Sequence, residues 1–158
     1  MAIIEGKLNG AGLRFAVIQA RFNDFIGQHL LNGAVNALKQ HNVAPEDIDT
    51  IFVPGSWELP LAAQKLAQTK KYHGLIALGV LIRGETPHFE YISAAMSSGL
   101  AAVSRENGVP VAFGVLTVDT MDQAIDRAGV KLGNKGAESA LAALEMASVL
   151  AQIESTES

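Results

Sequence analysis

The chain has 158 residues, a length that is typical of one domain and sufficient to bury a hydrophobic core. Its formal net charge of −4, without any run of basic residues, argues against nonspecific binding to nucleic acid. The absence of cysteine excludes disulfide bonds and thiolate chemistry. Hydrophobic residues reach 49% and charged residues only 18%, so we expect oligomerisation to cover some apolar surface.

Four apolar segments rich in strand-forming residues are predicted as β-strands: Leu13–Ala20, Thr50–Val53, Leu75–Leu81 and Val111–Thr117. Their apolar residues are nearly continuous, which is typical of strands covered on both faces. The segments around and between them are predicted as helices: Ile26–His41, Leu59–Thr69, Phe89–Glu106, Met121–Ala128 and Ala137–Ile153. This alternation predicts an α/β fold, a three-layer α/β/α sandwich around a four-stranded parallel sheet.

We expect neither a signal peptide nor a membrane-spanning segment. Met1–Gly10 lacks a basic segment followed by an apolar one, and the apolar run Leu75–Ile82 is far shorter than the roughly 20 residues that span a bilayer. We therefore expect a cytoplasmic protein with no membrane partner and no nucleic-acid partner. Residues 1–158 are expected to form one domain, with 1–10 as an N-terminal arm and 154–158 as a disordered tail.

Two predicted helices are unusually apolar. Ala137–Ile153 has only two charged residues, Glu138 and Glu145, and Ile92–Val103 is rich in small residues. Both helices could form a tight layer within the chain. We favour contacts between subunits, because a chain of this size cannot easily hide two such helices completely.

Ligands of open parallel sheets bind beyond the carboxyl ends of the strands. That rule selects four stretches of this chain, all with unusual residues: Arg21–Asp24, Pro54–Glu58, Gly79–Ile92 and Phe113–Thr117. In the third, Thr86 is predicted as a helix N-cap and Pro87 as the first helical residue. Such a helix start either is only well capped or offers backbone N–H groups to an anion. His88, in the first turn, could then exchange protons near neutral pH.

Other candidate residues each have an ordinary structural explanation. Phe22 could stack on a ligand but could also anchor a loop, and Glu58 could pair with Ser56 to bind hydroxyl groups or could only complement a helix dipole. Arg127 and Lys135 lie where a cation stabilises a helix end or a capping loop. No glycine-rich nucleotide loop and no histidine pair with metal-ligand spacing is present, so we expect neither a cofactor nor a metal.

Taken in order, several motifs resemble those of the 6,7-dimethyl-8-ribityllumazine synthase family over about residues 3–153. They are ARFN at Ala20–Asn23, PGSWELP at Pro54–Pro60, IRGETPHFEYI at Ile82–Ile92, PVAFGVLT at Pro110–Thr117 and RAGVKLGNKG at Arg127–Gly136. The resemblance implies a flavodoxin-like sheet. It also implies condensation of 5-amino-6-(D-ribitylamino)uracil with 3,4-dihydroxy-2-butanone 4-phosphate, without a cofactor and with release of phosphate and water.

The resemblance implies a role for each candidate. His88 would shuttle protons, Phe22 would stack on the pyrimidine ring, and Glu85, Thr86 and Arg127 would bind the phosphate. The remaining substrate contacts would come from Asn23, Ser56, Trp57, Glu58, Val80, Leu81, Ile82, Phe113 and Lys135.

The resemblance also implies a homo-oligomer, in which Phe113 would complete the site of a neighbouring subunit. The assembly would be a pentamer, and the short linker Gly129–Gly136 is similar to that of relatives in which twelve pentamers close into an icosahedral 60-subunit shell. Two alternatives stay open: a non-catalytic flavin-binding or shell-forming protein on the same fold, and a flavodoxin-like redox or signalling module. The second lacks any cofactor motif.

Overall fold

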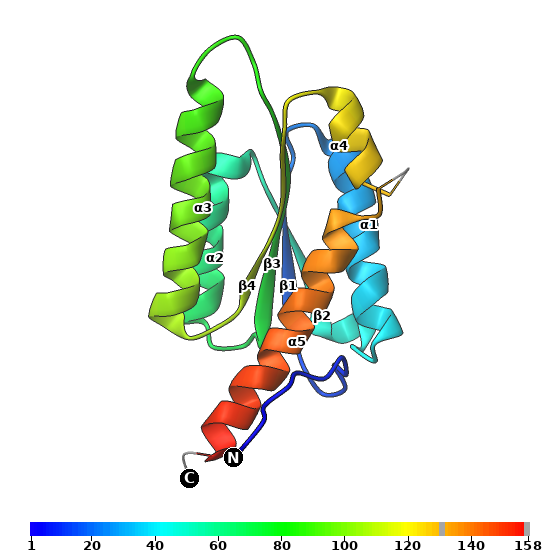
Figure 1. Cartoon of the computed structure of the whole chain (residues 1–158), viewed down its shortest axis with the longest axis vertical. Coiled ribbons are helices and arrows are strands. Elements are labelled where there is room, and N and C mark those ends of the chain that lie inside the picture. The colour runs from blue at the N-terminus through cyan, green and yellow to red at the C-terminus, as the bar shows by residue number, and fades with distance from the viewer. Residues whose placement is uncertain (130–131, 157–158) are drawn as a thin grey trace.

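The protein is described by a computed structural model over residues 1–129 and 132–156. Its centre is a four-stranded, all-parallel sheet in the order β2-β1-β3-β4 (Figure 1). The strands are β1 Phe15–Ala20, β2 Ile48–Val53, β3 Gly74–Ile82 and β4 Val111–Val118. The helices are α1 Asp24–Gln40, α2 Leu59–Gln68, α3 His88–Asn107, α4 Met121–Arg127 and α5 Lys135–Thr156, with 3₁₀ turns η1 Pro45–Asp47 and η2 Ser56–Glu58. The expected three-layer α/β/α fold is confirmed.

Two apolar layers hold the helices to the sheet. On one face, Phe15 and Val17 of β1 join the buried side chains of α1, α4 and α5. On the other face, Ala16 and Ile18 join those of α2 and α3 (Figure 1). Alternate residues of one strand therefore enter different layers, which explains why the strand segments are continuously apolar. No helix in the described part of the chain has the length and apolarity needed to cross a membrane.

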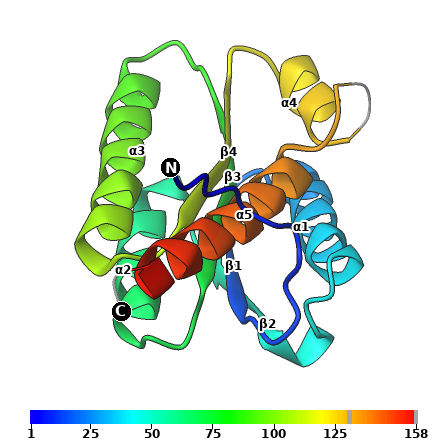
Figure 2. The same ribbon diagram turned by 60° about the horizontal axis from the view of Figure 1, so that its bottom comes forward.

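The N-terminal arm packs along α5, the last helix of the chain. The N-terminal arm crosses this helix (Figure 2), where the Lys7 N–H donates to Ser148 Oγ and Gln152 Nε2 donates to the Glu5 carbonyl. The helix extends three residues further than the sequence predicted, so residues 154–156 are helical and not a disordered tail. The Thr156 hydroxyl donates to the Ile153 carbonyl of the last turn, which stabilises this end. The remaining expected tail residues, 157–158, lie outside the described residues.

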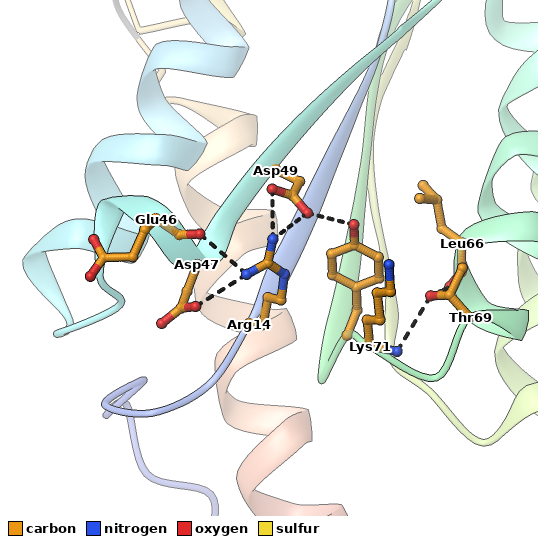
Figure 3. A network of polar contacts seen from close by, with 8 residues as sticks. Arg14, Glu46, Asp47, Asp49, Leu66, Thr69 and Lys71 are labelled. Atoms are coloured by element: carbon orange, nitrogen blue, oxygen red, sulfur yellow. Dashed lines mark hydrogen bonds and ion pairs between the residues drawn. The ribbon is translucent and has the colours of Figure 1, made fainter.

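An ion-pair network ties the amino-terminal ends of β1 and β2 together (Figure 3). Arg14 Nη2 donates to both carboxylate oxygens of Asp49, at 2.8 and 3.0 Å, and Nη1 donates to Asp47 Oδ1 at 3.3 Å. The Tyr72 hydroxyl donates to Asp49 Oδ2 at 2.6 Å. The hydrogen bond from Tyr72 and the Arg14 guanidinium hold the pKa of Asp49 below its usual value. Ion pairs and hydrogen bonds thus stabilise this end of the sheet, whereas the loops at the opposite end surround a cavity.

Candidate active site

A cavity of about 920 Å³ opens at the carboxyl ends of β1, β2 and β3. The turns after these three strands form its walls, together with the first turns of α3. Its lining residues are Phe22, Asn23, Pro54, Gly55, Ser56, Trp57, Glu58, Val80, Leu81, Ile82, Gly84, Thr86, His88, Phe89, Tyr91 and Ile92. Three of the four stretches selected from the sequence therefore meet at one site, as expected of a parallel sheet.

The turn after β1 presents Phe22 to the cavity. Asn23 adopts a left-handed conformation with φ of 63°, which asparagine tolerates better than most residues. Its side-chain Nδ2 donates to the Val80 carbonyl at 3.3 Å, and the Phe22 N–H donates to the Pro54 carbonyl at 3.1 Å. The Phe22 backbone N–H and the Asn23 side chain therefore attach this turn to the residue after β2 and to β3, and the ring itself is 70% exposed. An exposed aromatic ring on a fixed backbone is suited to stacking on a planar ligand.

The turn after β2 provides the polar groups of the wall. Ser56 is only 5% exposed and lies against Gly79 of β3, where a Cβ atom would come within 2.9 Å of Ser56 Oγ. Gly79 therefore leaves room for the serine hydroxyl beside the sheet. Trp57 is exposed and Glu58 is half-buried, and both belong to the short turn η2. A hydroxyl, an indole N–H and a carboxylate in one turn can together bind a polyhydroxylated ligand.

The connection between β3 and α3 carries His88. The structure corrects the predicted helix start: α3 begins at His88, Pro87 is the N-cap residue, and Thr86 makes no capping bond. The reason is that the Pro87 carbonyl accepts the N–H groups of Glu90 and Tyr91, which places the first helical bonds one residue later. Gly84, Glu85 and Thr86 make no hydrogen bond within the described residues, so their backbone N–H groups stay available to a ligand.

A family model described as 6,7-dimethyl-8-ribityllumazine synthase matches residues 12–151. The chain belongs to this family. Membership confirms the resemblance drawn from the motifs and places the protein among the transferases of the riboflavin pathway, enzymes that act on small-molecule substrates and typically assemble as oligomers. The four-stranded parallel sheet between helical layers agrees with the fold of lumazine synthases.

Four residues expected at the lumazine synthase site do not line the main cavity of a single chain: Glu85, Phe113, Arg127 and Lys135. Glu85 is exposed in the β3–α3 connection. The resemblance assigned Phe113 to the site of a neighbouring subunit; in its own chain it is the third residue of β4 and pairs with Ala77 in the middle of β3. It lies away from the carboxyl edge of the sheet because β4 continues to Val118.

Arg127 lies at the end of α4 and lines a second, polar cavity of about 480 Å³. Its Nη1 atom donates to the Gln123 carbonyl at 3.2 Å, one turn earlier in the same helix. Lys135 is the first residue of α5, following Asn134, whose side chain accepts the Ala137 N–H and so caps that helix. Arg127 and Lys135 therefore lie outside the main cavity of a single chain.

Six further residues of the main cavity lie within the selected stretches but were not named individually as site residues: Pro54, Gly55, Gly84, Phe89, Tyr91 and Ile92. Helical periodicity could have found two of them. Tyr91 and Ile92 follow His88 by three and four residues, so the three side chains share one face of α3. Tyr91 brings an additional exposed hydroxyl to the same wall.

Proposed function

We propose that the protein catalyses the lumazine synthase reaction. It condenses 5-amino-6-(D-ribitylamino)uracil with 3,4-dihydroxy-2-butanone 4-phosphate to give 6,7-dimethyl-8-ribityllumazine, phosphate and water. The observation that carries the proposal is one cavity lined by an exposed aromatic ring, a hydroxyl–indole–carboxylate turn and an imidazole beside free backbone N–H groups. These groups match a flat heterocycle, a ribityl chain and a phosphate ester in turn.

The proposed chemistry requires aligned substrates and repeated proton transfers. An amine attacks the ketone to form a Schiff base with loss of one water, phosphate leaves by elimination, and the second amine closes the ring with loss of a second water. His88 donates and accepts the protons, since imidazole changes charge near neutral pH. No step exchanges electrons with an external oxidant or reductant, so the reaction as proposed needs no redox cofactor. Alignment of two substrates in one cavity can lower a barrier by up to ~7–11 kcal/mol.

We further propose that each site is shared between two copies of the chain. Phe113, Arg127 and Lys135 of one copy complete the cavity of the next, with Arg127 opposing the phosphate charge. In support, Phe113 is 38% exposed, and small residues of α3 face outward: Ala94, Ala95, Ser98 and Ala101. The assembly is a pentamer, with the shell of twelve pentamers as its closed form, and light scattering measures both sizes.

The direct test incubates the protein with both substrates and follows lumazine fluorescence. The His88→Ala change should slow turnover by roughly 10- to 1,000-fold, a range that extends from below the ~10²–10⁴ typical of general acid–base catalysis to its middle. Arg127→Ala should lose more, because the phosphate charge loses its main partner. The matched control is His29→Ala, an exposed histidine of α1 outside the cavity, which should keep full turnover.

A wild-type protein that forms no lumazine would contradict the proposal. In that case flavin binding without turnover would support the alternative, a non-catalytic flavin-binding or shell-forming protein. Equal turnover of His88→Ala and wild type would remove the proton-transfer role of His88 alone and leave the activity.

A further inference from the structure

Arg83 connects three segments of the chain at the carboxyl end of the sheet. It follows the last residue of β3, and its backbone N–H donates to the Val118 carbonyl of β4 at 2.9 Å. Its guanidinium donates through Nη1 to the Glu90 carboxylate in the first turn of α3. It also donates through Nε to Asp119 Oδ1, just after β4, at 2.9 Å. The planar guanidinium suits two such bonds in fixed directions.

The first turn of α3 has a further contact with this guanidinium. The Cζ atom of Arg83 lies 4.6 Å from the centroid of the Phe89 ring. Phe89 and Glu90 directly follow His88, so both residues after the histidine contact Arg83. The favourable contacts with Asp119 and Glu90 raise the pKa of Arg83 above its already high value, so the cation persists at any working pH.

The rest of the β3–α3 connection has no comparable attachment. Figure 1 shows it as an arch beyond the end of the sheet, and Gly84, Glu85 and Thr86 form no hydrogen bond with the other described residues. Arg83 and its partners are thus the polar attachment between this arch, the start of α3 and the β4–α4 junction. Such an exposed segment would otherwise depend on packing alone for its position.

The Arg83 contacts continue toward Arg127. The Asp119 N–H donates to Gln123 Oε1 at 2.8 Å, and the Gln123 carbonyl accepts from Arg127. Arg83, Asp119, Gln123 and Arg127 line the same polar cavity of about 480 Å³. Arg83 itself does not line the main cavity of the described chain. Within its own chain it therefore touches the supports of the site and not the main cavity.

We propose that Arg83 is a positioning residue, which holds the first turn of α3 so that His88 faces the main cavity. The inference rests on the proposed function, because His88 is the proton-transfer group there. An ordinary surface ion pair would have little effect on either stability or activity. A positioning contact has little effect on stability but a large effect on turnover, since a shift of ~1 Å in a reacting group can cost ~100-fold in rate.

The test compares Arg83→Met with wild type, and Arg105→Met serves as a matched control. Arg105 is an exposed arginine of the last turn of the same helix and has no ion pair in the described structure. We expect Arg83→Met to lower kcat roughly 10-fold, within the ~100-fold possible for misplacement, with KM changed less than about 2-fold. The thermal midpoint should stay that of wild type. Arg83→Lys should give an intermediate kcat, because lysine keeps the positive charge but lacks the several N–H donors that the guanidinium holds in fixed directions.

A double-mutant comparison separates positioning from direct substrate contact. In a Glu90→Gln, Asp119→Asn background, the added Arg83→Met change should reduce kcat much less than it does in wild type. Hydrogen exchange of the peptide covering residues 84–91 should be faster in Arg83→Met and unchanged in Arg105→Met. Exchange needs no turnover, so it reports the tether independently of the reaction.

Each other outcome counts against the inference. Wild-type kcat in Arg83→Met overturns it, as does an undiminished Arg83→Met effect in the double background, which would assign direct substrate contact. Loss of kcat together with a lowered thermal midpoint in both Arg83 variants would assign a folding role. Absence of wild-type turnover would remove the proposed function, and faster exchange in Arg83→Met would then show a tether without a catalytic purpose.

Discussion

Gln19 in the middle of the sheet is fully buried, yet neither its Nε2 nor its Oε1 atom has a hydrogen-bond partner in the described structure. Its amide lies against Gly27 of α1, where a Cβ atom would come within 2.6 Å of Nε2. A buried amide without partners costs stability, so Gln19→Met should raise the free energy of unfolding by about 1–3 kcal/mol. Urea denaturation measures the change, with the exposed Gln28→Met as control. A lower free energy of unfolding would mean that a bound water or another group satisfies the amide.

Asp49 gives a pH dependence whose sign follows from its environment. Its pKa is lowered in the folded protein, first by the hydrogen bond from Tyr72 and then by Arg14 (Figure 3). The stabilisation is therefore present above the unfolded pKa of ~3.9 and is lost as the pH falls through the lower folded pKa. Asp49→Asn should reduce the free energy of unfolding by no more than about 1 kcal/mol at pH 7, because the network is partly exposed. Denaturation at pH 7 and at acid pH should show this difference shrinking; a constant difference would contradict the assignment.

Helices α1 and α5 approach each other closely where Gly136 meets Leu30. A Cβ atom on Gly136 would overlap the Leu30 carbonyl group, which is backbone and cannot rotate away. We expect Gly136→Ala to lower the free energy of unfolding by about 1–3 kcal/mol through overpacking. Gly55→Ala is the control, since a Cβ there meets only Glu58 Oε2 at 3.8 Å and φ is −150°, which alanine adopts readily. Equal stability of the two variants in chemical denaturation would mean that the helices can separate without cost.

At the scale of the whole molecule, the shared site predicts complementation between inactive chains. A mixture of His88→Ala and Arg127→Ala chains, co-expressed in equal amounts, should recover about a quarter of wild-type turnover, because random head-to-tail neighbours pair an intact His88 with an intact Arg127 in that share of sites. Separately assembled variants mixed without subunit exchange are the control. Turnover no higher than the mean of the two single variants would contradict a site shared between copies.

The motifs predicted the family and most of the cavity-lining residues, because these residues lie in turns and at strand ends that local sequence determines. The left-handed turn at Asn23 and the strand ends before Ser56 and His88 each follow from local sequence. Local sequence failed at the start of α3: Thr86 is a preferred cap residue, yet the Pro87 carbonyl begins the helix.

By itself, the sequence determined the strand–helix alternation, the absence of thiol chemistry, the family and most of the cavity-lining residues. These properties follow from residue type and spacing along the chain. Only the tertiary structure decided that Arg83 joins three segments and that Arg127 lines a different cavity from His88 within one chain. It also showed that the buried Gln19 amide has no hydrogen-bond partner among the described residues. Such properties depend on contacts between residues distant in sequence, and the packing of helices on the sheet sets those contacts.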